Sequence, residues 1–206
     1  LDGQNMTFVY SSSGSASISF SKVNAYGSKL NASGNTGVYT AYTWGTLSFE
    51  GCKNYCNVDS TDDYVAAFAG YPLDDISFAN CVNYGDVACK KSSAFICNGA
   101  YTDVTTFVNC DNKGNLISID DSNMCFAASG VSDSLLMKSS VLEKTFKHSD
   151  GTDGGKLVVD QATYNNMTNR TNMVVLGDKA TQSKYFERCA FNDAGELEVK
   201  LVANSP

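Results

Sequence analysis

The stretch Leu47-Ser-Phe-Glu-Gly-Cys-Lys-Asn-Tyr-Cys-Asn-Val58 decides the fold, because it returns twice along the chain. Residues 76–87 read Ile-Ser-Phe-Ala-Asn-Cys-Val-Asn-Tyr-Gly-Asp-Val, and residues 105–116 read Thr-Thr-Phe-Val-Asn-Cys-Asp-Asn-Lys-Gly-Asn-Leu. The Phe and the first Cys of each copy recur every 29 residues, as the numbering shows. A fixed period of this length is typical of chains that stack structural repeats.

The repeat extends in both directions, and the sequence predicts about six units. The first four anchors are spaced by 29 residues, and the last two follow at intervals of 39 and 40. Residues 1–130 would therefore form regular units, and residues 131–206 would form units elaborated by insertions. The expected anchors are Phe20, Phe49, Phe78, Phe107, Phe146 and Phe186.

Each unit has the pattern of short strands and turns. Ile76–Ala79 alternates apolar and polar residues, as a half-buried strand does, and an apolar run such as residues 64–69 follows it. One unit cannot bury its apolar face alone, but stacked neighbours cover it. We therefore expect an all-β chain, a β-solenoid (parallel β-helix) that forms a single repeat domain over residues 1–206. A leucine-rich repeat is the alternative fold, since its period overlaps this one, and substantial helix content would distinguish it.

Equivalent positions of successive units should form columns. A small residue stands three positions after each anchor, and an amide often stands five positions after it. We expect the thiols either to be buried and free or to include at least one disulfide, and the amides to form a structural ladder. The columns are Cys52, Cys81 and Cys110, and Asn54, Asn83 and Asn112.

A tyrosine column, Tyr26, Tyr55 and Tyr84, stands six positions after the anchors and ends in Lys113. Two interpretations are open. The rings could stack on one another and cover strand backbone, or they could form a platform on which sugar rings dock.

Charged residues form another column. Asp62, Lys91 and Asp120 stand at equivalent positions of successive units, and Asp63, Lys90 and Asp121 flank them. The pattern is typical of corner electrostatics, in which the lysines relieve repulsion between the acids. A cation site, or paired acids for glycoside chemistry, is the alternative.

Isolated candidate groups give weak signals. His148 is the single histidine and lies in a polar stretch. The segment 150–155 lacks the ligands of a proper calcium loop, and Cys52 and Cys56 have no second pair to complete a zinc site. We expect no catalytic residue, no metal and no cofactor.

Composition excludes several partners. The net charge of −7 and the absence of a basic stripe argue against nucleic acid, and no apolar run is long enough to insert in a membrane. Four glycosylation sequons, at Asn5, Asn31, Asn166 and Asn169, are about as many as chance would place in a chain so rich in Asn, Ser and Thr.

The pattern Ile-Ser-x-x-Asn-Cys-x-Asn-x-Gly-x-Val of residues 76–87 resembles the GLUG-type repeats of bacterial surface proteins. About residues 18–130 can be laid on that pattern, although Ala and Phe replace the usual Gly-Gly-Leu-Val-Gly run. The resemblance implies a β-solenoid in a secreted or cell-surface protein, used for adhesion, spacing or glycan contact.

Three functions follow as hypotheses. The first is a non-catalytic extracellular structural or adhesion module that contacts a glycan or a host or cell-surface protein, with Tyr26, Tyr55 and Tyr84 as the glycan-binding residues. The second is a filament or sheath subunit that self-associates through its ends. The third is a β-helix polysaccharide lyase or hydrolase.

Overall fold

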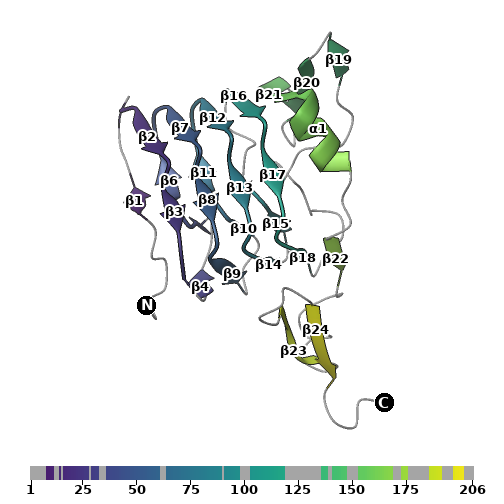
Figure 1. Cartoon of the computed structure of the whole chain (residues 1–206). Coiled ribbons are helices and arrows are strands. Elements are labelled where there is room, and N and C mark those ends of the chain that lie inside the picture. Colours follow the sequence, from purple (N-terminus) through teal and green to yellow (C-terminus); the bar gives the residue numbers. More distant parts are fainter. Residues whose placement is uncertain are drawn as a thin grey trace.

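A computed structural model of the chain consists mostly of β-strands arranged in parallel sheets (Figure 1). The expected all-β, parallel character is thereby confirmed. The structure describes residues 8–11, 14, 16–27, 29–32, 36–60, 64–89, 91–97, 103–118, 136–138, 141–147, 153–168, 173–175, 186–191 and 197–201.

The first two 29-residue segments each contain five short strands, and the described parts of the next two contain four and three of them. In the segment that contains Phe49 they are β7 (Leu47–Glu50), β8 (Lys53–Asn54), β9 (Asn57–Ser60), β10 (Tyr64–Ala66) and β11 (Ala69–Pro72). The preceding segment contains β2 (Ile18–Ser21), β3 (Asn24–Ala25), β4 (Lys29–Ala32), β5 (Thr36–Gly37) and β6 (Thr40–Thr43), with β1 (Val9–Ser11) before it. The following segments contain β12 (Ile76–Ala79), β13 (Val82–Asn83), β14 (Val87–Cys89) and β15 (Lys91–Ser93), then β16 (Val104–Val108), β17 (Asp111–Asn112) and β18 (Leu116–Ser118).

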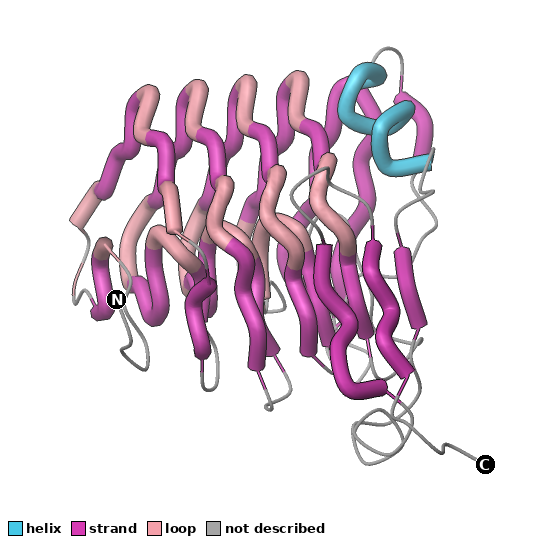
Figure 2. The backbone as a smooth tube through the Cα atoms, turned by 60° about the horizontal axis from the view of Figure 1, so that its bottom comes forward, coloured by secondary structure: helices cyan, strands magenta, loops and turns pink. Residues whose placement is uncertain are grey.

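Strands of successive segments pair side by side in parallel at a constant register. Phe49 lies between Phe20 and Phe78, and Phe107 follows Phe78. Figure 2 shows the same path of the backbone repeated from segment to segment. Within these segments the strand orders are β1-β6-β11, β15-β10-β5, β17-β13-β8-β3, β18-β14-β9-β4 and β16-β12-β7-β2.

A left-handed residue ends each strand of the Phe column. Lys22, Asn80 and Asn109 have φ between 51° and 55°, and Gly51 occupies the equivalent position with φ 63°. Asn and Gly tolerate this conformation better than most residues. The amides also bond along the column, since Asn109 Nδ2 donates to Asn80 Oδ1 at 2.7 Å. The same corner is therefore turned in each segment.

The chain after residue 118 departs from the predicted period. Phe107 lies beside Val159 of β21 (Asp153–Asp160), and not beside Phe146. Phe146 belongs to β20 (Val141–Lys147), which pairs antiparallel with β21 and with β19 (Leu136–Lys138). The intervals of 39 and 40 residues therefore do not describe the register. The prediction failed because the apolar alternation of an antiparallel hairpin resembles that of a repeat strand.

The last predicted anchor is also outside the column. Phe186 lies in β23 (Phe186–Phe191), which pairs antiparallel with β24 (Leu197–Leu201) in a separate two-stranded sheet. The parallel arrangement is continued instead by β22 (Met173–Val175), which pairs with β18.

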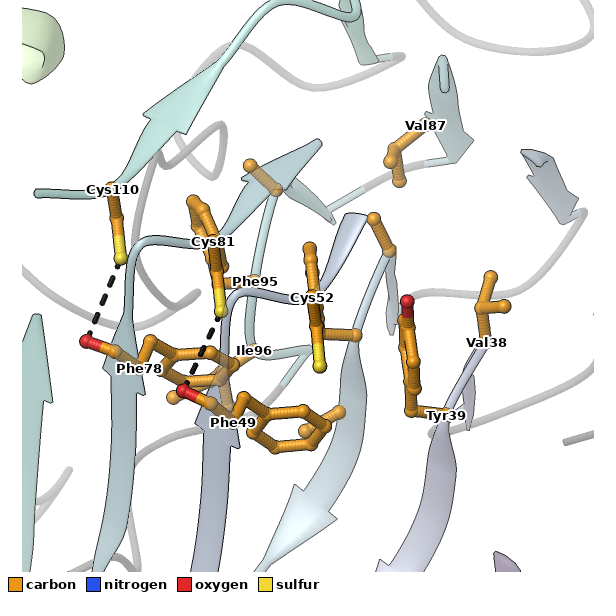
Figure 3. Packing of buried hydrophobic residues seen from close by; sticks show 14 of the residues in the cluster. Val38, Tyr39, Phe49, Cys52, Phe78, Cys81, Val87, Phe95, Ile96 and Cys110 are labelled. Atoms are coloured by element: carbon orange, nitrogen blue, oxygen red, sulfur yellow. Dashed lines mark hydrogen bonds between the residues drawn. The ribbon is translucent and has the colours of Figure 1, made fainter. Parts of the chain in front are cut away.

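Aromatic rings form the interior. Phe20, Phe49, Phe78 and Phe107 stack with centroids 4.8–5.0 Å apart and planes within 7°. Figure 3 shows how Phe95 packs across Phe78, with centroids 5.3 Å apart and planes at 66°. These two columns of rings, one stacked along the sheet and one edge-on from the opposite wall, fill the space between the sheets.

Tyr39 occupies the second ring column, where Phe68 and Phe95 follow it. Its side chain is fully buried, and its hydroxyl lies 2.9 Å from the carbonyl oxygens of Val23 and Lys53. These two carbonyls belong to neighbouring segments. The phenol therefore bridges the segments from inside the core, where burial raises its pKa above the usual range.

The helix α1 (Gln161–Thr168) was not predicted from the repeat. It follows β21 directly, and its buried Thr163 accepts a hydrogen bond from Cys110 N at 2.9 Å through its hydroxyl. Asn166 Nδ2 donates to Cys110 O at 2.8 Å. The helix thus satisfies backbone groups beside β17 that a further repeat strand would otherwise have paired. In the described part of the chain, no helix combines the length and apolar character that crossing a bilayer requires.

Asp160 is the N-cap of α1, and its replacement is expected to destabilise the fold. Oδ1 accepts hydrogen bonds from Thr163 N at 2.9 Å and from Asn109 N at 3.1 Å. Partial burial acts to raise the pKa of Asp160, but these hydrogen bonds hold it below its usual range. Asp160→Ala should lower the free energy of unfolding at pH 7 by about 1–2 kcal/mol in denaturant titrations.

The pH dependence separates the charge of Asp160 from its geometry. Because the pKa is lower in the folded state, the stabilisation is complete above the unfolded value of about 4 and is lost as pH falls through the folded value. Asp160→Asn should retain most of the cap without this dependence. Equal stability of Asp160→Ala and the parent protein at pH 7 would contradict the assignment.

Candidate functional site

The amide column is a continuous hydrogen-bonded ladder. Asn54 Nδ2 donates to Asn83 Oδ1 at 2.9 Å, and Asn83 Nδ2 donates to Asn112 Oδ1 at 2.7 Å. Each Nδ2 also donates to the carbonyl two residues later, as Asn83 does to Gly85 at 2.7 Å. Asn54 and Asn83 are fully buried. Their hydrogen-bonding groups are used within the protein, which suits a structural role.

The thiol column lies beside this ladder. Cys52, Cys81 and Cys110 are fully buried, and their Sγ atoms donate to the carbonyls of Phe20, Phe49 and Phe78 at 3.4–3.6 Å. Figure 3 shows the bonds of Cys81 and Cys110. The six described cysteines, which also include Cys56, Cys89 and Cys97, form no disulfide. The hydrogen bond with Cys110 raises the pKa of Cys81 to about 12. A buried thiol with a raised pKa is a poor nucleophile and metal ligand, because both roles need the thiolate.

The tyrosine column forms a face-to-face stack on the surface. Tyr26 and Tyr55 have ring centroids 4.8 Å apart with planes at 4°, and Tyr55 and Tyr84 have centroids 4.8 Å apart with planes at 2°. Tyr26 is 73% exposed and Tyr84 is 41% exposed. Because the rings cover one another, the inner faces of the stack are closed to a sugar ring. Stacking of this kind is what the self-stacking interpretation expects, and sugar docking on the tyrosine column stays a prediction.

Lys113 ends the tyrosine column. Its ammonium group forms an ion pair with Asp111, and this hydrogen-bonded contact raises the pKa of Lys113. The pair lies largely in solvent, so its contribution to stability is small.

A second aromatic patch was missed in the sequence. It consists of Tyr42, Trp44 and Tyr71, and we call it the Trp44 patch. Tyr42 is 39% exposed and Trp44 is 49% exposed, whereas Thr43 between them is fully buried. The Tyr42 and Tyr71 rings stack with centroids 5.2 Å apart, and the Trp44 ring lies at 66° to Tyr42 with centroids 6.3 Å apart. The alternation along residues 42–46 could have indicated an outward-facing row, but Trp44 itself has no aromatic copy in the next segment.

Carboxylates gather near the Trp44 patch. Asp74, Asp75 and Asp103 each offer an oxygen within 4.8 Å of the others, and Asp75 and Asp103 are exposed. Asp75 Oδ1 accepts a hydrogen bond from Val104 N at 2.9 Å, and Asp74 Oδ1 accepts one from Asp75 N at 2.9 Å. These bonds explain the positions of the side chains as parts of a turn, so the cluster alone defines no metal site.

The other predicted polar candidates lie outside the described residues. These are Asp62, Asp63, Lys90, Asp120, Asp121, His148 and Asp150. Of Lys91 the structure describes the backbone, which pairs with Tyr64 in the β10–β15 ladder. The expected charge column is thus not placed by the structure. Cys56, by contrast, is described, and its Sγ donates to Asn57 O at 3.4 Å.

A partly buried carboxylate interrupts another amide column. Asn57, Asp86 and Asn115 stand at equivalent positions, and Asp86 Oδ1 accepts hydrogen bonds from Asn115 N at 2.9 Å and Asn115 Nδ2 at 3.1 Å. The Asp86 backbone N donates to Asn57 Oδ1 at 2.9 Å. Burial raises the pKa of Asp86, although the bonds from Asn115 partly oppose this effect.

Replacing Asp86 by Asn is expected to stabilise the protein. A carboxyl group whose pKa is raised on folding stabilises the fold when it is protonated, and this contribution is lost as pH rises through the folded value. At pH 7 the partly desolvated charge is a cost, and Asp86→Asn removes it while keeping the acceptor for Asn115. We expect a gain of about 1 kcal/mol in the free energy of unfolding at pH 7, which shrinks as pH falls towards 4. A loss of stability at pH 7 would show that the charge itself is needed.

Comparison with known proteins identifies no relative. No protein-family model, no curated protein and no solved structure matches the chain.

Proposed function

We propose that the chain is a β-solenoid module of a secreted or cell-surface protein, with a structural and adhesive role and no catalytic activity. Similarity of residues 76–87 to GLUG-type repeats suggested this role, and one observation of the structure carries it. The strands of the first four segments pair in parallel without a change of register, so that the equivalent residues Ile18, Leu47, Ile76 and Thr105 lie side by side. Such a stack forms an extended, regular surface suited to spacing and contact.

The chemistry of the repeated side chains supports a scaffold. The amides of Asn54, Asn83 and Asn112 bond to one another, and the phenylalanine rings stack in the core. Repetition is thus used for cohesion between segments. In the Trp44 patch, by contrast, the exposed Trp44 stands at a position where the next segment has Leu73.

The cysteines are compatible with a place outside the cell. The described thiols are buried, and Cys52, Cys81, Cys97 and Cys110 have no exposed surface. Inaccessible thiols resist oxidation and exchange. Buried thiols at these positions are therefore compatible with an oxidising environment.

Immunolabelling of the organism that makes the protein tests the location. An antibody against the chain should label intact cells, or detect the chain in the medium, without permeabilisation. A cytoplasmic marker should remain unlabelled in the same cells. Labelling that appears only after permeabilisation would overturn the proposal.

Self-association is a second candidate, favoured by the edge strands of the first segment. Among the described residues, β2, β3 and β4 each pair with a strand on one side alone. The exposed edge of a parallel sheet can accept a further strand from another molecule. Light scattering over a range of concentrations tests this candidate, and a monomer at high concentration would eliminate it.

A further inference from the structure

We propose that β2 is the docking edge for a second copy of this chain, and that the two β2 strands pair antiparallel about a two-fold axis at Phe20. The proposal rests on the self-association candidate and deepens it, because it names the partner, the strand and the size of the assembly. The exposure of the first segment, the direction of its backbone groups and the cover at the other end of the stack support it.

The first segment leaves apolar side chains partly uncovered at positions that the next segment buries. Its half-buried residues are Ile18, Phe20 and Val23, and the buried equivalents are Leu47, Phe49 and Cys52. Tyr26 at 73% and Phe8 at 58% are the most exposed large hydrophobic side chains among the described residues. The Phe8 ring lies against Phe20, with centroids 6.4 Å apart. An apolar end surface of this kind often marks an interaction site.

The backbone of β2 presents hydrogen-bonding groups on its outer side. Ile18 N donates to Thr46 O at 2.9 Å, and Lys22 N donates to Glu50 O at 2.7 Å, so these residues face β7. Backbone groups alternate between the two sides of a strand, and this directs the N–H and C=O groups of Ser19 and Ser21 to the outer edge. In the described part of the chain, β2 is the last strand of its sheet.

These outer groups are self-complementary. In an antiparallel pair, two residues that face each other can exchange both N–H···O bonds. When Ser19 lies opposite Ser21 of the second copy, Ser21 lies opposite the second copy's Ser19, and Phe20 lies opposite its own equivalent. One strand therefore supplies both sides of the contact, as a two-fold interface requires. Because an axis perpendicular to a sheet preserves its faces, the Phe20 rings of both copies lie on the same side of the extended sheet.

The strand β2 lacks the features that usually protect an edge. Natural edge strands avoid pairing with other molecules through charged side chains, proline or a bulge. Residues Ile18–Ser21 include no charge and no proline, and they pair with β7 without a register shift. The opposite edge of the same sheet is the hairpin of β19 and β20, which contains Lys138, Glu143, Lys144 and Lys147. Protection is thus found at one edge of this sheet and not at the other.

Cover at the other end of the stack limits the assembly to two copies. β21 pairs with β16, β22 pairs with β18, and α1 bonds to the backbone of Cys110 beside β17 (Figure 1). The strands β16, β17 and β18 are the equivalents of β2, β3 and β4 in the fourth segment. Head-to-tail addition along these three sheets is therefore blocked, whereas a symmetric contact through β2 closes after two copies.

Sedimentation of the full chain tests the size of the assembly. Analytical ultracentrifugation over a wide range of concentrations should show a reversible equilibrium between monomer and dimer, without larger species. A monomer at every concentration would overturn the proposal. A series of species that grows beyond the dimer would overturn it too, because it requires association at a second surface.

Charged residues on the edge test the strand and its register. Ser19→Lys with Ser21→Lys places like charges opposite each other in both pairs, and should raise the dissociation constant of the dimer by about tenfold or more. Ser19→Lys with Ser21→Glu places opposite charges there, and this variant should dimerise at least as well as the parent. Both serines are exposed, so the monomer tolerates these changes. Ser77→Lys, at the equivalent exposed position of β12 inside the sheet, is the matched control and should dimerise as the parent does.

The outcomes separate this proposal from those on which it builds. If the variant with two lysines dimerises as the parent does, another surface makes the contact, and docking on β2 is wrong while self-association stands. If both charge variants are weakened alike, the antiparallel register is wrong. Circular dichroism verifies that each variant is folded. Labelling of intact cells, which tests the surface module, is independent of all these results.

Discussion

Replacing Asn83 by Asp is expected to lower the free energy of unfolding at pH 7 by about 3–5 kcal/mol, because it introduces an uncompensated buried charge. The change is nearly isosteric, but the carboxylate cannot donate. Asn83 Nδ2 donates to Gly85 O and Asn112 Oδ1, each at 2.7 Å, and the side chain is fully buried. In the variant, a negative oxygen would face these two acceptors. Equilibrium denaturation monitored by circular dichroism measures the loss.

The pH dependence and the position in the ladder provide controls for Asn83→Asp. A buried carboxyl that faces acceptors has a raised pKa, so the deficit relative to the parent should narrow as pH falls and the group takes up a proton. Asn112→Asp, at the partly buried end of the ladder, should lose less. An equal loss in both variants would mean that burial of the ladder does not determine its contribution.

Gly85→Ala is expected to cost about 3 kcal/mol, because the added methyl group meets backbone of the neighbouring segment. A Cβ at Gly85 would overlap the carbonyl oxygen of Cys56 and lie 2.6 Å from its carbonyl carbon and 2.8 Å from Asn54 Nδ2. These atoms cannot move without separating the strands and stretching the amide ladder. Thermal and chemical denaturation should both show the loss.

Gly27→Ala is the matched control, since Gly27 stands in the same column. A Cβ there would meet the Sγ atom of Cys56 at 3.1 Å, and a thiol can rotate away. We expect a cost below about 1 kcal/mol. Similar losses at Gly27 and Gly85 would show that the backbone conformation of the turn, and not contact between segments, determines the requirement for glycine.

The regular part of the fold could be predicted from the sequence because its pairing rule is a constant offset. Once Phe49 and Phe78 are aligned, the neighbours of every intervening residue follow, including the partners of Asn54 and Cys52. In a parallel repeat, residues that contact one another across segments are one period apart in the sequence. The period can be found in a single sequence, and the contacts follow from it.

The rest could not be predicted because the same local patterns serve different pairings. Phe146 lies in a strand with the expected alternation, but that strand pairs antiparallel with β21. The helix after Asp160 was obscured by the expectation of a further unit, although an Asp before a helical stretch is an N-cap signal. Trp44 was overlooked for a related reason. Aligning equivalent positions of successive segments singles out residues that recur, and Trp44 does not recur.

The buried hydroxyl of Tyr39 has a consequence for how the array opens. In a stack of repeats held by nearest-neighbour contacts, the terminal repeat can detach while the others stay folded. Tyr39 belongs to the first segment and contacts Val23 O of the same segment and Lys53 O of the next, so detaching the first segment leaves the Lys53 carbonyl without this contact. Lys53 N and Tyr55 N donate to Val23 O and Ala25 O, and their amide protons should therefore exchange with solvent when the first segment detaches, before those of Val82 and Tyr84 one segment further on.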